Sequence, residues 1–294
     1  DLVLSSESGP AKGVICNPDT PHLCYTHSPM RYIWDQYHAY REGLSWPMRM
    51  LWTVVSHKLR IWDVAASNRV DRYVANSSFV ARRVMRCWGR ESDVVHPPVD
   101  LEAYRSAPAP GPDAPYLFLS ELVPYKRADL AIEACKLLGR RLKIVGSGSE
   151  MERLKKIAGP GVEFLGRVPD AEMRALYHSC RALLFPGVED FGIVPLEAMA
   201  CGVPVVAPRR GTYTEMLERT GGGVLVEPEN LAGLEQTLEQ IAGDRARLAE
   251  LGRRAAHGVR EHYSTGEMTT RALDVYERLM QARTGSGRSE AEPR

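Results

Sequence analysis

The stretch from Ala182 to Pro208 reads ALLFPGVEDFGIVPLEAMACGVPVVAP and sets two glutamates, Glu189 and Glu197, eight positions apart. The runs ALLFP and VPVVAP are apolar, and the segment between them, VPLEAMACG, holds strong helix formers and stops at a glycine. We therefore predict strand, loop, helix and strand, with Glu189 in the loop and Glu197 in the first turns of the helix. Ligands bind at this carboxyl edge of an open α/β sheet, and a helix N-terminus there favours anions, so we expect a phosphate.

The same alternation continues through the second half of the chain. YLFLSE, RLKIVG and VEFLG have the pattern of strands, and residues 128–138, 151–157 and 170–179 have the pattern of helices. This repeat predicts an α/β fold with a parallel, doubly wound sheet. The first 95 residues show shorter strands, among them DLVLSS, HLCYTH, RYVANSS and SDVVH, around the helical stretch PMRMLWTVVSHKLRIWDVAAS.

Proline content marks the boundary between these two halves, because residues 96–115 hold six prolines in twenty positions and read as a linker. Residues 232–263 are helical by pattern, and the polar tail is expected to be disordered. DLVLSS reads as a buried strand with nothing before it, so we expect the chain to begin inside a domain. We therefore predict a partial first domain at residues 1–95, the linker at 96–115 and a complete second domain at 116–263. A helix at 264–283 is expected to return to the first domain, and the tail follows at 284–294.

The charge of the 294-residue chain is nearly balanced, at a formal +1, which gives no argument for a nucleic-acid partner. Residues 31–90 differ from the rest, because they hold eleven Lys and Arg against four Asp and Glu, and all five tryptophans. Such a segment suits an anionic membrane surface or a lipid-phosphate acceptor. A solvated basic helix face with tryptophans in the core explains the same composition equally well.

The six cysteines form no C-x-x-C pair, and several lie in apolar runs, as buried free thiols do. This usage predicts a reducing, cytoplasmic location. No apolar run reaches the ~18 residues of a membrane span, and no signal peptide is visible.

Several motifs together resemble one enzyme family. EDFGIVPLEAMACGVPVVA, preceded by VPYKR and VGSGSE, closely resembles the sugar-nucleotide-binding half of glycosyltransferase family 4, which are retaining enzymes whose GT-B fold has two Rossmann-like domains facing a cleft. YTHSPMRYIWDQYHAY and VVHPPVD are similar to the WbaZ-like branch of bacterial O-antigen and exopolysaccharide mannosyltransferases. The resemblance covers residues 1–280, and implies an incomplete acceptor-side domain at 1–95 and a nucleotide-sugar domain at 116–263.

The implied reaction moves a sugar from a nucleoside diphosphate to a hydroxyl with retention at the anomeric carbon. Negative charge develops on the departing diphosphate, so the protein mainly positions the donor and stabilises that charge. Lys126 matches the family lysine that contacts the diphosphate, and Arg127 is adjacent to it. The backbone N–H groups of Phe191, Gly192 and Ile193 would complete the anion site.

The two glutamates of the opening stretch receive separate roles from the resemblance. Glu189 matches the glutamate that meets the hydroxyls of the transferred sugar. Glu197 matches the one that accepts hydrogen bonds from the ribose, and two carboxylate oxygens suit a vicinal diol. The two glutamates therefore lie on either side of a helix N-terminus. Glu189 would bind the sugar, the helix N-terminus the phosphate, and Glu197 the ribose.

Other site residues are expected on both halves of the chain. His27 is similar to the family histidine that faces the donor sugar, and Arg31, four positions on, is expected to reach the phosphates or an acceptor. Two strand-end turns are expected at the nucleobase, where their backbone groups could read it: Gly146, Gly148, Arg167 and Val168. No Asp-x-Asp motif and no His or Cys cluster with metal spacing occurs, so we expect neither a metal nor another cofactor.

The sequence departs from the family at Glu121, which occupies the position of the usual arginine. A carboxylate beside a diphosphate is unfavourable unless a cation pairs with it. Arg31 and Arg127 are the candidate partners, and weakened donor binding is the alternative.

We predict a retaining hexosyltransferase, with transfer of mannose from GDP-mannose to a lipid-linked or polysaccharide acceptor as the first choice. We expect the enzyme in the cytoplasm, associated peripherally with the inner membrane. A UDP-linked donor stays open. Two alternatives remain: a sugar-nucleotide 2-epimerase of the same fold, and a noncatalytic or impaired nucleotide-sugar-binding module.

Overall fold

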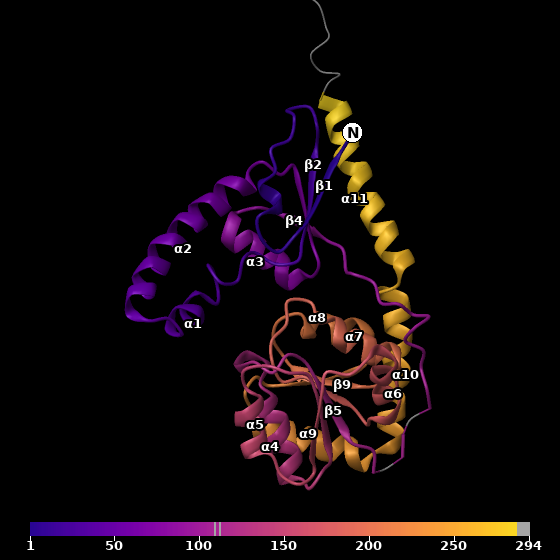
Figure 1. The fold of residues 1–294 in the computed structure, drawn as a ribbon. Helices are drawn as coiled ribbons and strands as arrows, with labels where there is room; N and C mark the ends of the chain where they lie inside the picture. The colour runs from indigo at the N-terminus through magenta and orange to yellow at the C-terminus, as the bar shows by residue number, and fades with distance from the viewer. Residues whose placement is uncertain (109, 112, 287–294) are drawn as a thin grey trace, which may run out of the picture. The chain divides into compact units, whose positions relative to one another are not determined.

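The computed structural model describes residues 1–108, 110–111 and 113–286. The chain divides into two compact units (Figure 1). The first unit holds Asp1–Pro97 together with the C-terminal residues from Met268, and the second holds Pro98–Glu267. Both units are α/β structures built on parallel sheets.

The second unit contains a six-stranded parallel sheet with the strand order β10-β9-β8-β5-β6-β7. The strands, in chain order, are β5 (Tyr116–Leu119), β6 (Leu142–Val145), β7 (Val162–Gly166), β8 (Leu183–Leu184), β9 (Val205–Pro208) and β10 (Gly223–Val226). The helices are η2 (Pro124–Lys126), α4 (Ala128–Leu137), α5 (Met151–Ile157), α6 (Asp170–Ser179), α7 (Ile193–Ala200), α8 (Tyr213–Thr220), α9 (Leu231–Gly243) and α10 (Arg245–His262). This arrangement confirms the predicted doubly wound sheet.

Strand β5 shows why the sheet is covered on both faces. Its side chains alternate between two apolar clusters, with Leu117 and Leu119 in one and Tyr116 and Phe118 in the other. Because all four residues are buried, no face of this strand is left for water. Helices therefore lie on both sides of the sheet, as Figure 1 shows.

The order of the strands reverses at β5. From this strand the chain proceeds outward through β6 and β7, and it then returns to place β8 on the other side of β5. The loops after β5 and β8 consequently leave the sheet side by side and diverge. In open α/β sheets such a reversal opens a crevice at the carboxyl edge, where ligands bind.

The first unit has a four-stranded parallel sheet with the order β1-β2-β3-β4. Its elements are β1 (Val3–Glu7), η1 (Ala11–Gly13), β2 (His22–Thr26), α1 (Tyr37–Glu42), α2 (Trp46–Ser67), β3 (Arg72–Ala75), α3 (Ser78–Trp88), β4 (Ser92–Val94) and most of α11 (Thr265–Ser286). Cys24 and Tyr73 pack with α3 in one cluster. Leu23 and Val74 pack in another with Val275 of α11.

The boundaries between the parts of the chain differ from those expected. Residues 98–108 belong to the second unit, because Val99 enters its core and the N–H of Ala107 donates to the carbonyl oxygen of Cys201 at 3.2 Å. The expected linker is therefore largely a packed segment, and residues 109 and 112 of it lie outside the described residues. Of the expected tail, 284–286 continue α11, and 287–294 lie outside the described residues.

Candidate donor site

Lys126 lies on the loop that leaves β5 at the strand-order reversal. It ends the short helix η2, and the next residue, Arg127, adopts a left-handed conformation with φ of 54°. The loop after β8 touches this backbone, because a Cβ on Gly187 would lie only 2.5 Å from the Cα of Lys126. Glycine is thus required where the two loops meet.

The ammonium group of Lys126 forms a salt bridge with Glu189 across these two loops. Lys126 is 6% exposed, so its charge requires a partner that compensates for the lost hydration. The same nitrogen lies 5.0 Å from the ring centre of Tyr125 and 5.7 Å from that of Phe185, at cation–π distance. The structure therefore brings together the two residues that the sequence assigned to diphosphate and sugar.

Helix α7 begins immediately beyond Glu189. Its N-cap is Gly192, with φ of 85°, and no side chain caps the first turn. Phe191 turns its ring into the core, 6.2 Å from that of Tyr263, while Ile193 is exposed. The helix N-terminus thus lies next to the Lys126–Glu189 pair, as expected for an anion site.

Glu197 lies one turn into α7 and is held by tyrosines. The hydroxyl of Tyr177 on α6 donates to its Oε2 at 3.1 Å. Burial raises the pKa of Glu197, while hydrogen bonds from Tyr177 and Tyr104 oppose that rise. Neither tyrosine was expected at the site, although Tyr177 stands in a recognisable helix pattern.

The two strand-end turns expected at the nucleobase are joined to each other. Arg167 donates through Nε to the hydroxyl of Ser147 at 3.0 Å. A Cβ on Gly146 would lie 1.8 Å from the carbonyl oxygen of Ser120, and one on Gly148 would lie 2.3 Å from that of Leu122. These glycines therefore permit close contact between the loops after β5 and β6. Val168 packs against the core.

The cation that neighbours Glu121 along the chain has other partners. Arg127 pairs with Asp129 at 3.1 Å and with Glu229 at 3.8 Å, and these contacts give no support to Arg127 as the candidate partner of Glu121. Asp129 prevails because it lies two residues away on the first turn of α4. Glu121 itself is exposed.

The candidate residues of the first unit lie at the carboxyl edge of its own sheet. His27 follows β2, and its Nε2 lies 2.9 Å from the hydroxyl of Ser6. The ring is packed edge-on against Tyr25, and partial burial lowers the pKa of the imidazole. Arg31 lies 3.4 Å from Asp35, and its pairing with Glu121 stays a prediction.

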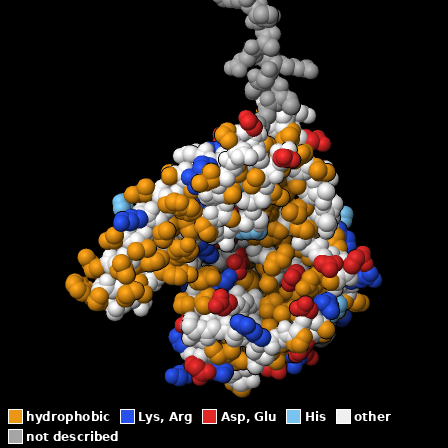
Figure 2. Space-filling view, turned by 45° about the horizontal axis from the view of Figure 1, so that its top comes forward, with side chains coloured by type: hydrophobic (Ala, Val, Ile, Leu, Met, Phe, Trp, Pro, Cys, Tyr) orange, Lys and Arg blue, Asp and Glu red, His pale blue; other side chains and the backbone are white. Residues whose placement is uncertain are grey.

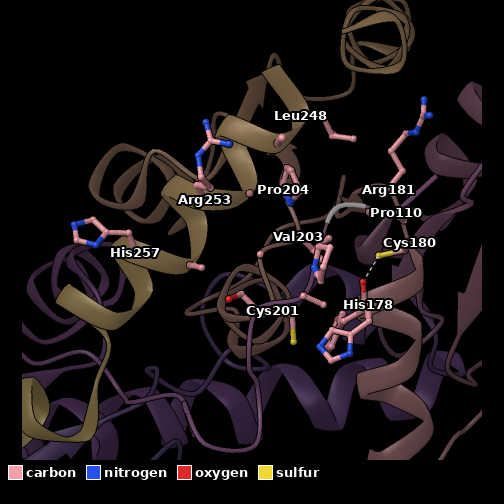
Figure 3. Close-up of a pocket in the computed structure, with 18 of the residues that line it drawn as sticks. Pro110, His178, Cys180, Arg181, Cys201, Val203, Pro204, Leu248, Arg253 and His257 are labelled. Carbon is pink, nitrogen blue, oxygen red and sulfur yellow. Dashed lines mark hydrogen bonds between the residues drawn. The ribbon is translucent and has the colours of Figure 1, made fainter. Parts of the chain in front are cut away.

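A cavity of about 390 Å³ lies elsewhere in the second unit (Figure 3). Its walls include Arg181 and Val203, which precede β8 and β9, so it opens at the amino edge of the sheet. The ligand crevice of an α/β sheet lies at the opposite edge, and this cavity is therefore not the donor site. Within the described residues, no group of three His, Cys, Asp or Glu side chains is arranged to hold a metal ion.

Two Rossmann-like units with parallel sheets, the second with a cation and a helix N-terminus at its strand-order reversal, define a GT-B fold. The chain belongs to the family described as glycosyl transferases group 1, whose model matches residues 102–258.

Curated relatives support this assignment. The chain is 31% identical over 245 residues to D-inositol 3-phosphate glycosyltransferase of Streptomyces bingchenggensis, covering 71% of this chain and 53% of that protein. It is 29% identical over 254 residues to the GDP-mannose-dependent alpha-(1-6)-phosphatidylinositol monomannoside mannosyltransferase of Mycolicibacterium smegmatis, covering 76% and 64%. The chain spans about half the length of the first of these relatives.

Solved structures show the same fold. Sucrose-phosphate synthase from Thermosynechococcus elongatus matches with a TM-score of 0.77 at 18% identity, covering 96% of this chain and 74% of that one. Anabaena HepE in complex with UDP matches with a TM-score of 0.70 at 21% identity, covering 89% and 72%.

Proposed function

We propose that the protein is a retaining glycosyltransferase of family 4 that transfers a hexose from a nucleoside diphosphate sugar to a hydroxyl. The observation that carries the proposal is the Lys126–Glu189 salt bridge beside the N-terminus of α7, at the reversal of the strand order. A buried ammonium group and uncapped helix N–H groups converge there, and together they suit a diphosphate.

Each step of the reaction then has a residue to support it. The bond between the anomeric carbon and the phosphate oxygen breaks, a bond to the acceptor oxygen forms, and the acceptor proton passes to the departing phosphate oxygen. Lys126 and α7 stabilise the charge that develops on the diphosphate. When Lys126 pairs with the diphosphate, Glu189 loses this partner and becomes free to accept hydrogen bonds from the sugar. Glu197 accepts hydrogen bonds from the ribose.

GDP-mannose is our first candidate for the donor and a lipid-linked or polysaccharide hydroxyl for the acceptor, as in the WbaZ-like mannosyltransferases. The relative from Mycolicibacterium smegmatis is GDP-mannose-dependent by name, which favours this choice. HepE binds UDP, which keeps UDP sugars as the second candidate.

The test compares the melting temperature of the protein with GDP, UDP, GDP-mannose and UDP-glucose, with and without EDTA. NMR then follows the donor during incubation with an acceptor alcohol. We expect GDP release and an α-mannoside, unaffected by EDTA. Epimerised donor sugar would identify a 2-epimerase, and donor binding without turnover would identify a binding module. A melting temperature that responds to none of the four nucleotides would contradict the proposal.

We also propose that the protein binds anionic membranes through α2. The large hydrophobic side chains exposed along α2 include Trp46, Met48, Met50, Leu51, Val54 and Ile61. Figure 2 shows hydrophobic side chains gathered over this helical part of the first unit. Arg49 and Lys58 lie on the same helix, whose one acidic residue, Asp63, is buried. Apolar side chains with basic neighbours suit an anionic bilayer surface.

No helix in the described part of the chain is long and apolar enough to cross a bilayer. The test therefore measures surface binding, by sedimentation with vesicles of phosphatidylcholine alone and with added phosphatidylglycerol. We expect binding only to the anionic vesicles, and its loss in Leu51→Glu. The matched control is Leu137→Glu, since Leu137 is 65% exposed on α4 of the other unit. Equal binding of the two variants would contradict the membrane assignment.

A further inference from the structure

The carboxylate of Glu197 is supported from within the second unit by two tyrosines. Tyr177 is fully buried, and its hydroxyl donates to Oε2 of Glu197 at 3.1 Å. The ring of Tyr104 meets that of Tyr177 edge-on, with centres 6.0 Å apart, and the phenol of Tyr104 opposes the rise in the pKa of Glu197 that burial causes. Tyr177 thus bonds the acid directly, and Tyr104 packs against the ring of Tyr177.

The phenols remain donors across the physiological pH range. Burial and the nearby Glu197 raise the pKa of Tyr104 to about 12 and that of Tyr177 well above its usual value. Both side chains therefore carry their proton wherever the protein is folded near neutral pH.

Tyr104 comes from the segment that brings the chain into the second unit. Just after Tyr104 this segment contacts two helices, because Nε2 of His178 lies 2.9 Å from the carbonyl oxygen of Arg105, and the N–H of Ala107 donates to the carbonyl oxygen of Cys201 at 3.2 Å. Cys201 follows α7 directly, and His178 lies at the end of α6. The segment consequently ties together the helices that carry Glu197 and Tyr177.

We propose that Tyr177 and Tyr104 are positioning residues that fix the carboxylate of Glu197 for recognition of the ribose diol. The inference rests on the proposed function and adds the residues that control the selection of ribose over deoxyribose. An ionised carboxylate offers about four acceptor positions. The phenol of Tyr177 occupies one of them, and the remaining positions accommodate the two hydroxyls of a ribose. Fixing the acid beforehand also lowers the entropy lost when the nucleotide binds.

The test measures dissociation constants of the full chain for GDP and 2′-deoxy-GDP, or for UDP and 2′-deoxy-UDP if uracil is the preferred base. Wild type should prefer the ribose form. Tyr177→Phe keeps the ring and removes the hydroxyl, and it should weaken binding of the ribose form roughly five-fold while changing the deoxy form much less. Tyr104→Phe should act in the same direction. In a Glu197→Gln background, Tyr177→Phe should have no comparable effect on the ribose preference.

The matched control is Tyr116→Phe. Tyr116 is equally buried and donates to the carbonyl oxygen of Leu238 at 3.2 Å, in the apolar cluster on the other face of the sheet. Tyr116→Phe should lower the free energy of unfolding measured in urea without changing the preference for ribose.

Measurement of GDP affinity over a range of pH adds a second test, because a simple loss of packing would not shift the pH at which binding weakens. Phenol donors lower the pKa of Glu197, so their removal raises it. Binding of GDP should therefore weaken on acidification at a higher pH in Tyr177→Phe than in wild type. An unchanged ribose preference and pH profile in Tyr177→Phe, with Glu197→Ala still impaired, would overturn the inference and leave the proposed function standing. Failure of wild type to bind any nucleoside diphosphate would overturn both.

Discussion

Lys126 pairs with Glu189 in the structure, and in the proposed donor complex it would pair with the diphosphate instead. This exchange of partners explains how a buried ammonium group can bind a charged ligand. In the structure its ammonium group is compensated by Glu189. A buried ion pair costs hydration on both sides, and breaking it leaves an uncompensated charge. In the proposed donor complex a diphosphate would carry more negative charge than one carboxylate and would also meet the N-terminus of α7. We therefore expect exchange of Glu189 for the diphosphate to be favourable and to free an acceptor for the sugar.

Glu189→Gln tests this exchange. The amide removes the negative competitor for Lys126 and keeps the size of the side chain, so the affinity for GDP should stay the same or rise, while turnover falls. Glu197→Ala, in contrast, should weaken GDP binding about ten-fold, because it removes buried acceptors. Calorimetry with GDP and a turnover assay measure the two effects. Equal losses of GDP affinity in both variants would contradict the separate roles.

Gly187→Ala tests the contact that positions Lys126. The added methyl would meet the Lys126 backbone at 2.5 Å, where nothing flexible can yield. Overpacking of this kind costs about 1–3 kcal/mol, so the free energy of unfolding should fall and GDP binding should weaken. Gly243→Ala is the matched control, because no atom lies within 4 Å of its Cβ position. Urea unfolding of the two variants measures the difference, and equal stability would refute the assignment.

Among the elements, α10 shows how a continuous helical pattern can hide a boundary. Residues 232–263 were expected to be helical throughout, but α9 ends at Gly243 and α10 begins at Arg245. Asp244 separates them, and its Oδ1 accepts from the N–H of Arg247 at 2.8 Å. Capping by Asp satisfies one of the free N–H groups of a new helix.

Asp244→Ala should therefore lower the free energy of unfolding by about 1 kcal/mol, since it removes the acceptor at the start of α10. Asp244→Asn keeps an acceptor oxygen and should cost much less. Urea unfolding followed by circular dichroism measures both. A loss as large in the asparagine variant as in the alanine variant would show that capping is not the cause.

The sequence predicted most strands and helices because their signals are local. The apolar runs around Leu117 and Leu183 identify buried strands without knowledge of their neighbours, and the helix formers between two such runs predicted the places of Glu189 on a loop and Glu197 on a helix. The place of Tyr104 could not be predicted in the same way, because its contact with the ring of Tyr177 joins residues far apart in the chain. The signal that was available but missed was Asp244, a common N-cap residue after a glycine.

On the scale of the whole molecule, residues 98–108 belong with the second unit, and this changes where that unit can be cut. A fragment from Pro98 to Glu267 retains Val99 in its core and Tyr104 against the ring of Tyr177. We expect it to fold and to bind GDP within a few-fold of the full chain. A fragment from 115 to 263 lacks these contacts and should melt at a lower temperature and bind more weakly. Indistinguishable melting and binding of the two fragments would contradict this account.

Helix α11 makes the first unit discontinuous in the chain, since Val275 and Leu279 pack with strands that lie before residue 96. During synthesis these strands are made before the second unit, and the residues of α11 that pack on them are made after it. A domain whose segments are contiguous can fold as it emerges. The second unit should thus be finished first, and the strands of the first unit, although they are made before it, should become stable only once α11 has been made, exposed to chaperones and proteases throughout the interval.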